Sequence, residues 1–207
     1  MGEGEAPVVV KLGGSLAFSH NLQQWIAACT ACAGRVVIVP GGGPFADTVR
    51  SAQARMQFDH QAAHRMAVLA MEQYGHALAS RNALLAPADS ADAIRHCLSG
   101  QRVPVWMAAR MVFDAPDIAQ SWDVTSDSLA VWLSDRIGAA RLFLIKSVEL
   151  SSRRESCETL AETGIVDTAF PRYFQKSAVR CSILGSTDHF LAMTAIRDGA
   201  SVGVSIE

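Results

Sequence analysis

Two short apolar runs, each ending in glycines, restrict the possible folds of this chain more than any other feature. Residues 7–12 (PVVVKL) stop at residues 13–15 (GGS), and residues 35–40 (RVVIVP) stop at residues 41–43 (GGG). β-Branched apolar runs without polar alternation are typical of strands that are buried on both faces of a sheet. The two runs therefore predict two buried strands, each followed by a tight loop.

The rest of the chain continues as alternating strands and helices. The hydrophobic pattern predicts helices at 22–33, 44–55, 60–82, 89–98, 125–138 and 187–197, and further strands at 103–107, 141–146, 179–184 and 202–206. This order is typical of an α/β fold with a mainly parallel sheet covered on both faces. The polar stretch 151–163 has no clear period and is predicted to be a mobile surface loop, either a lid or a connection. We expect a single domain over residues 1–207.

Charge and composition argue against several kinds of partner. The formal net charge is -2, so nucleic acid and anionic membrane surfaces are not expected to bind. No apolar run reaches the roughly 20 residues that cross a bilayer. The five cysteines are scattered and follow no leader-like segment, so we expect a cytoplasmic protein.

The two glycine clusters are expected to bind anions. Ligands of open parallel sheets collect at the carboxyl ends of the strands, so both loops should face one crevice. Glycine lets backbone N–H groups approach an anion closely, and a helix beginning after each loop would add the positive end of its dipole. One such loop would be no more than a turn, but two at equivalent positions favour a phosphate site. Neither loop has P-loop or dinucleotide-binding spacing.

Two lysines and an aspartate are the candidates for chemistry at this crevice. Lys11 and Lys146 end apolar strands, where they would meet a bound anion; otherwise each is a solvated surface lysine. Asp127 falls in the first turn of a predicted helix with Thr125 or Ser126 as N-cap, and we expect it to orient the two ammonium groups. Phosphoryl transfer requires in-line positioning and cations, which the lysines, backbone amides and Mg²⁺ would supply.

Four blocks of the sequence resemble the ordered signatures of a known enzyme family. The blocks 8–15 (VVVKLGGS), 36–47 (VVIVPGGGPFAD), 123–134 (DVTSDSLAVWLS) and 142–149 (LFLIKSVE) are similar to those of the amino acid kinase family, which includes acetylglutamate, aspartate, uridylate and isopentenyl phosphate kinases. The resemblance implies a three-layer α/β/α sandwich. It also implies a homo-oligomeric kinase that uses ATP and Mg²⁺.

The resemblance further implies roles for individual residues. Lys11 and Lys146 would stabilise the transferring phosphoryl group, and Asp127 would organise them. The ATP phosphates would be held by the first loop and the second lysine, that is, by Gly13, Gly14, Ser15 and Lys146. The acceptor would be held by the second loop, that is, by Gly41, Gly42 and Gly43. The sequence departs from the family after Lys146, where the usual aspartate is replaced by serine.

Within the family, the short chain and residues 64–75 (HRMAVLAMEQYG) are similar to the kinases of methanofuran biosynthesis. Those enzymes extend aminomethyl-furanmethanol phosphate to its diphosphate. Such an acceptor carries a phosphate, for which Arg50, His64 and Arg65 are candidates, and an amine, for which Asp47 is the candidate. Each of these four residues could equally be a solvated helical residue.

Two alternatives remain open. The same kind of kinase could act on isopentenyl phosphate, a nucleoside monophosphate or an amino acid carboxylate. The missing aspartate after Lys146 instead suggests a non-catalytic nucleotide- or oxyanion-binding protein that keeps the loops. We expect no protein-built metal site, because His60 and His64 have zinc-ligand spacing but no evident third ligand.

Overall fold

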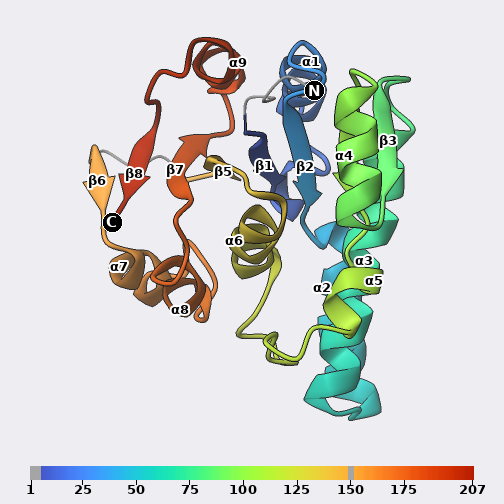
Figure 1. Ribbon diagram of the computed structural model, residues 1–207. Helices are drawn as coiled ribbons and strands as arrows, with labels where there is room; N and C mark the ends of the chain where they lie inside the picture. Colours follow the sequence, from blue (N-terminus) through green and yellow to red (C-terminus); the bar gives the residue numbers. More distant parts are fainter. Residues whose placement is uncertain (1–5, 149–151) are drawn as a thin grey trace.

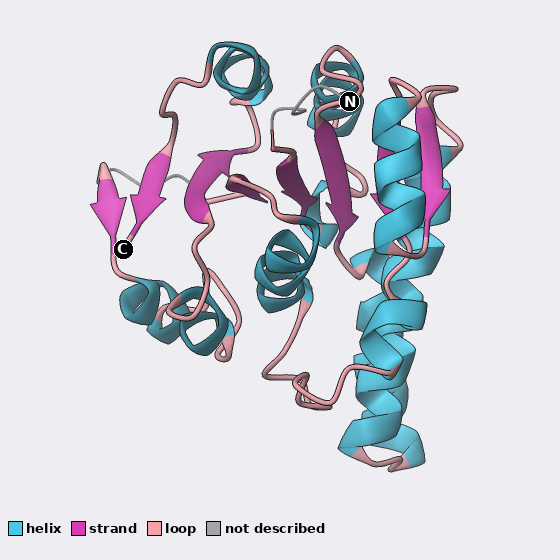
Figure 2. Ribbon diagram, in the orientation of Figure 1, coloured by secondary structure: helices cyan, strands magenta, loops and turns pink. Residues whose placement is uncertain are grey.

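The computed structural model describes residues 6–148 and 152–207 and builds them around one eight-stranded sheet. The strand order is β3-β4-β2-β1-β5-β7-β8-β6 (Figures 1 and 2). The strands are β1 (Val8–Leu12), β2 (Val36–Pro40), β3 (Leu85–Ala88), β4 (Val103–Trp106), β5 (Arg141–Lys146), β6 (Arg154–Glu155), β7 (Arg180–Gly185) and β8 (Val204–Ile206). Of the strand pairs that are neighbours in this order, β7 and β8 run antiparallel and all the others run parallel. The expected mainly parallel sheet is confirmed.

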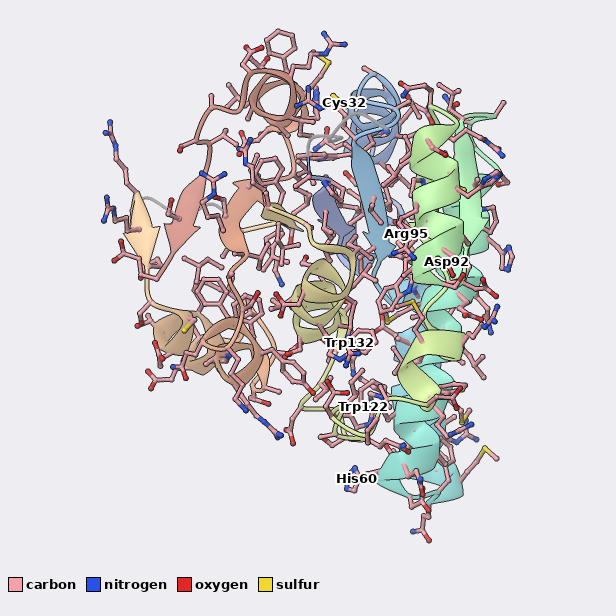
Figure 3. All side chains as sticks on the ribbon, in the orientation of Figure 1. Cys32, His60, Asp92, Arg95, Trp122 and Trp132 are labelled. Atoms are coloured by element: carbon pink, nitrogen blue, oxygen red, sulfur yellow. The ribbon has the colours of Figure 1, made fainter. Side chains whose placement is uncertain are left out.

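Helices cover both faces of the sheet, which confirms the three-layer α/β/α sandwich. They are α1 (Asn21–Thr30), α2 (Gly43–Met56), α3 (His60–Ala79), α4 (Ala91–Ser99), α5 (Ala109–Phe113), α6 (Ser126–Ile137), α7 (Cys157–Glu162), α8 (Phe170–Phe174) and α9 (His189–Asp198). α1 and α9 lie on one face, while α6, α7 and α8 lie on the other (Figure 1). Trp132 of α6, which is labelled in Figure 3, stacks on Trp106 of β4, with ring centroids 6.3 Å apart. α3 contributes side chains to the apolar clusters on both faces.

Two departures from the sequence expectation have local causes. β3 reads LAPA, without β-branched residues, and its Pro87 is tolerated because β3 is the edge strand of the sheet. The first glycine loop is not followed directly by an α-helix: Gly14–Leu16 form a single 3₁₀ turn, and α1 begins only at Asn21. The helix N-termini near the loops are therefore those of α2 and α6. Within the described residues, no helix is long and apolar enough to cross a membrane.

The expectation of a mobile loop over residues 151–163 is wrong for most of that stretch. Residue 151 lies outside the described residues, residues 154–155 form β6, and residues 157–162 form α7. The Ser156 side chain caps α7 by accepting from the Thr159 N–H. Cys157 and Leu160 are buried. The apolar residues of this stretch, Cys157, Leu160 and Ala161, are too few to show a helical period, so the helix could not be recognised from the sequence.

Replacing Leu160 with alanine is expected to lower the free energy of unfolding by about 2–5 kcal/mol, because Leu160 is 1% exposed and its loss leaves a cavity. Urea denaturation measures the effect. Glu162→Ala is the control on the same helix, since Glu162 is exposed, and should stay close to wild type. Equal stability of the two variants would mean that α7 is not part of the core.

Candidate active site

The two glycine loops meet at the carboxyl ends of three adjacent strands. β1 pairs in parallel with β2 on one side and with β5 on the other. The chain passes from β1 to β2 in one direction and later returns to the opposite side of β1 at β5. Ligands of open α/β sheets bind at such a reversal of strand order. The loops after Leu12 and Pro40 and the side chain of Lys146 therefore share one crevice.

The two loops approach each other so closely that side chains are excluded between them. A Cβ atom added to Gly14 would lie 2.6 Å from the backbone nitrogen of Gly43, and one added to Gly41 would lie 2.6 Å from that of Gly14. The Gly41 N–H donates to the Leu12 carbonyl oxygen at 2.8 Å. The glycines thus serve a packing need in addition to any contact with an anion.

Gly14→Ala is expected to destabilise the protein more than Gly13→Ala. The nearest atom to a Cβ on Gly13 would be the Ile145 carbonyl oxygen at 3.2 Å, a contact that small shifts relieve, whereas Gly14 would collide with backbone at 2.6 Å. The clash at Gly14 should cost about 1–3 kcal/mol. Thermal or urea unfolding of the two variants checks this, and the reverse order of stability would contradict the close approach of the loops.

Asp127 lies between the two lysines. Its Oδ1 is 2.9 Å from Lys11 Nζ, and its Oδ2 accepts a hydrogen bond from Lys146 Nζ at 2.7 Å. Lys11 and Asp127 are each 5% exposed. Burial alone would raise the pKa of Asp127, but the charges and hydrogen bonds of the two lysines outweigh it and lower the pKa to about 2. The structure thus brings the three predicted catalytic residues together in one buried cluster.

The cluster has one more positive than negative charge, counting these three side chains alone. Burial and the charge of Lys11 lower the pKa of Lys146, while Asp127 and, to a smaller extent, Asp167 oppose that shift. A buried group of two ammonium ions and one carboxylate is incompletely compensated, because charges in a low-dielectric environment need full pairing. An anion such as a phosphate would complete it.

Asp167 is a component of the site that the sequence did not reveal. Its Oδ2 accepts from the backbone N–H groups of Thr125 and Ser128, each at 3.0 Å, and from the Thr125 hydroxyl at 2.8 Å. Its Oδ1 accepts from the Ser128 hydroxyl. Thr125 occupies the expected N-cap position, but the capping side chain is that of Asp167. Burial and the charge of Asp127 raise the pKa of Asp167. Asp167 therefore anchors the turn that carries Asp127.

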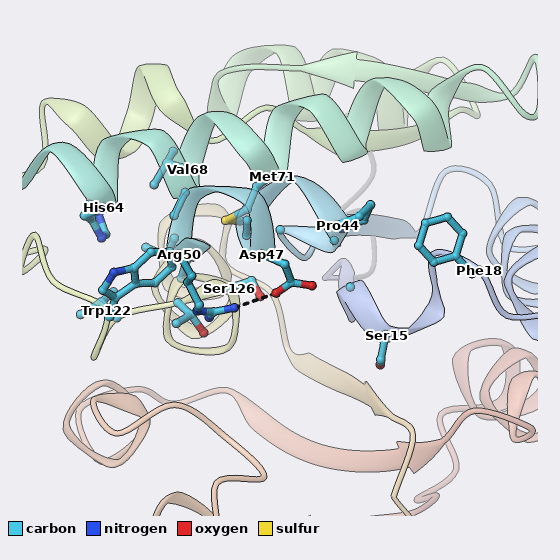
Figure 4. Close-up of a pocket in the computed structure, with 18 residues that line it drawn as sticks. Ser15, Phe18, Pro44, Asp47, Arg50, His64, Val68, Met71, Trp122 and Ser126 are labelled. Carbon is cyan, nitrogen blue, oxygen red and sulfur yellow. Dashed lines mark hydrogen bonds and ion pairs between the residues drawn. The ribbon is translucent and has the colours of Figure 1, made fainter. Parts of the chain in front are cut away.

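A cavity of about 470 Å³ opens beside the cluster, between α2, α3 and the start of α6 (Figure 4). Of the residues proposed for phosphate or acceptor binding, it is lined by Gly14, Ser15, Gly42, Gly43, Asp47, Arg50 and His64. Arg65 is not among its lining residues; its guanidinium lies 4.1 Å from the centroid of the Phe113 ring. Gly13 and Gly41 lie behind the lining, in the contacts between the loops.

Arg50 is held in the cavity wall by its neighbours. Its guanidinium lies 4.5 Å from the centroid of the Trp122 ring and donates to Asp47 Oδ1 at 3.0 Å (Figure 4). Trp122 is fixed in turn, because its Nε1–H donates to Gln53 Oε1 at 2.7 Å. Trp122 itself lines this cavity.

His64 is a buried part of the same wall. It is 2% exposed, and its Nδ1 lies 3.2 Å from the Ser121 carbonyl oxygen. Burial lowers the pKa of His64 below its ordinary value. Its Nε2 has no hydrogen-bond partner among the described residues.

A second cavity, of about 340 Å³, lies on the other side of the cluster. It is lined by residues after β5 and around β7 and β8, including Val148, Ser152, Gly185 and Asp188. Gly185 is the register partner of Lys146 in the sheet, so this cavity begins beside the second lysine. The Lys11–Asp127–Lys146 cluster thus lies between the two cavities. Among the described residues, no group of three or more His, Cys, Asp or Glu side chains could hold a metal ion.

The sequence is similar to that of a known kinase. In sequence, the chain is 23% identical over 145 residues to the [5-(aminomethyl)furan-3-yl]methyl phosphate kinase of Methanocaldococcus jannaschii; the match covers 68% of this chain and 66% of that protein, just under two thirds of its length.

Solved structures of uridylate kinases share the fold. The enzyme from Archaeoglobus fulgidus superposes with a TM-score of 0.73 at 18% identity, over 97% of this chain and 100% of that one. The UMP kinase from Bacillus anthracis gives 0.72 at 15% identity, over 98% and 96%. Residues 6–153 match the model of the amino acid kinase family. The chain belongs to the amino acid kinase family.

Proposed function

We propose that this protein transfers the γ-phosphoryl group of ATP to a small acceptor that carries a phosphate. The observation that carries the proposal is the buried Lys11–Asp127–Lys146 cluster, in which two ammonium groups share one carboxylate, beside two glycine loops and between two cavities. Its relative from Methanocaldococcus jannaschii is by name a kinase of such an acceptor.

The charge distribution suits an acceptor whose attacking oxygen is already ionised. The pKa of Asp127 is about 2, so this carboxylate is a poor base for removing a proton from a hydroxyl group. A phosphate monoester has a second pKa near 6, so at neutral pH its oxygen attacks without a base. The new bond forms between this oxygen and the γ-phosphorus, the bond to the β,γ-bridging oxygen breaks, and ADP leaves with the electron pair. Lys11 and Lys146 stabilise the charge on the transferring group.

The larger cavity is the proposed acceptor site. The N-terminus of α2 at Gly42 and Gly43, that of α6 at Ser126, and Arg50 converge on it, and all three attract a phosphate. Beyond them the wall is formed by apolar side chains and an indole, namely Val68, Met71, Trp122 and Leu129. A flat ring such as furan would fit there. The most specific acceptor we propose is therefore (aminomethylfuranyl)methyl phosphate, in methanofuran-type cofactor biosynthesis.

The smaller cavity is the proposed place for the nucleoside of ATP, with its phosphates reaching over Gly13, Gly14 and Ser15 toward Lys146. Mg²⁺ commonly keeps several waters and binds through substrate phosphates with one or two carboxylates. The described residues offer no protein-built cage, so the ion would be held chiefly by the phosphates of ATP, where it would neutralise part of their charge. A homo-oligomer and a cytoplasmic location stay predictions.

ADP formation with Mg-ATP across an acceptor panel tests the proposal. The panel contains the aminomethyl-furan phosphate, isopentenyl phosphate, uridine monophosphate, aspartate and acetylglutamate. Turnover with the furan phosphate well above the others supports both the reaction and the acceptor, whereas turnover with another member keeps the kinase and replaces the acceptor. ATP binding without turnover on any member would favour the non-catalytic binding protein.

A further inference from the structure

The orphaned nitrogen of His64 is a buried polar group that the proposed phosphoryl transfer does not use. His64 projects from α3 into the wall of the acceptor cavity and is 2% exposed. A buried polar atom without a partner costs free energy, and such groups in folded proteins are uncommon. Because Nε2 of His64 has no partner in the part of the chain that the structure describes, it points to a group supplied by a bound ligand.

The hydrogen bond at the other ring nitrogen determines what Nε2 can bind. The partner of Nδ1 is the Ser121 carbonyl oxygen, which only accepts, so Nδ1 carries the proton. Burial favours the neutral ring, because it lowers the pKa of His64. In the neutral ring with a proton on Nδ1, Nε2 presents a lone pair. Such an atom accepts a hydrogen bond from a ligand and would repel a phosphate oxygen.

The position of His64 in the cavity indicates which part of the acceptor it meets. In Figure 4, Ser126, Asp47 and Ser15 lie toward the phosphoryl-transfer side, and His64 lies at the opposite end, beyond Arg50 and above Trp122. The stretch between them is bordered by Val68 and Met71. An acceptor with its phosphate at the loops would reach His64 with its far end.

We propose that His64 determines acceptor specificity by accepting, at Nε2, a hydrogen bond from an N–H or O–H group at the far end of the acceptor. This deepens the proposed function and rests on it. It replaces two contacts that the sequence suggested, that of His64 with the phosphate and that of Asp47 with the amine. The phosphate is left to Arg50 and the helix N-termini. A site built around such a bond rejects an analogue that lacks the donor, because the buried acceptor atom is then left unpaired.

Three furan phosphates that differ only at the far substituent test the proposal: aminomethyl, hydroxymethyl and methyl. With wild-type protein, the kcat/KM of the better donor-bearing compound should exceed that of the methyl compound by about 10- to 100-fold, the range expected for one buried hydrogen bond. The aminomethyl and hydroxymethyl compounds separate an N–H from an O–H ligand. Equal kcat/KM values for all three compounds would overturn the proposal.

Matched variants connect the discrimination to Nε2. His64→Asn keeps a donor near Nδ1 but removes the distal acceptor, so the ratio between donor and methyl compounds should fall toward one. His64→Gln places an amide oxygen near the position of Nε2 and should retain more of the ratio. His60→Asn makes the same replacement at an exposed histidine one turn earlier on α3 and should not alter the ratio. A ratio that survives His64→Asn would contradict the role.

A binding measurement separates this proposal from the kinase assignment. The ¹⁵N NMR signal of His64 Nε2 should move when wild-type protein with ADP binds the donor-bearing compound, and move less with the methyl compound. This readout needs neither turnover nor a folded His64 variant. If no compound is phosphorylated but the signal still responds to the donor, the kinase function fails and the reading of His64 stands. If turnover occurs but the His64 signal moves equally with the donor-bearing and methyl compounds, the kinase function stands and the proposed role of His64 fails.

Discussion

Replacing Lys146 with alanine is expected to lower kcat at least about 100-fold while leaving the fold intact, and Lys11→Ala should do the same. Asp127 fixes the ammonium group of each lysine. In the proposed reaction, these groups lie where charge develops on the transferring phosphoryl group. Removing one preorganised donor from such a site typically costs about 10²–10³ in kcat. Steady-state ADP formation at saturating ATP and acceptor measures the effect, with circular dichroism as the check on folding.

The control for these variants is Lys176→Ala. Lys176 is exposed and lines neither the acceptor cavity nor the cavity beside Lys146, so its loss should leave kcat near wild type. KM for ATP is expected to rise less than kcat falls in Lys11→Ala, because an interaction that strengthens in the transition state acts mainly on kcat. Near-normal kcat in both Lys11→Ala and Lys146→Ala would reject the proposed mechanism.

The main parts of this site could be anticipated because they depend on local sequence. A lysine at the end of an apolar strand, or an aspartate in the first turn of a helix, has a position that strand and helix patterns determine. Parallel strands then bring their carboxyl ends to one edge, so Lys11 and Lys146 had to lie near each other once β1 and β5 were neighbours. The roles of these residues in catalysis stay predictions.

The parts that could not be anticipated depend on contacts between distant segments. Asp167 anchors the start of α6 from 42 residues further along the chain, and nothing near it in sequence indicates this partner. The Ser121 carbonyl oxygen, 57 residues away, keeps the proton on Nδ1 of His64 and so leaves the lone pair on Nε2. The expectations for Arg65 and for residues 151–163 were drawn from local polarity, but the structure directs Arg65 to Phe113 and folds residues 157–162 into α7.

Asp127→Asn is the variant for which we expect the second large effect, on both stability and catalysis. Asparagine has nearly the same shape, so packing is kept while the charge is lost. Lys11 and Lys146 would then face each other in a buried site without the carboxylate that now lies 2.9 Å and 2.7 Å from them. Breaking a buried ion pair by removing one partner typically costs about 3–5 kcal/mol. We expect a loss at the lower end in urea denaturation at neutral pH, together with a kcat reduced at least about 100-fold.

The pH dependence of this stability loss distinguishes a charge effect from a packing effect. In the variant, burial and Lys11 still lower the pKa of Lys146, and the opposing charge of Asp127 is gone, so the pKa falls further. A lysine with a lowered pKa in the folded state costs stability at pH values where the unfolded chain is protonated, and the cost fades as pH rises toward the ordinary lysine pKa of about 10.4. The deficit of Asp127→Asn relative to wild type should therefore shrink between neutral and alkaline pH. ATP should also raise the melting temperature of the variant more at neutral than at alkaline pH, because its phosphates supply the missing negative charge. A deficit that stays constant with pH would mean that Asp127 acts through its shape and hydrogen bonds, and the excess positive charge on which the kinase proposal relies would lose its support.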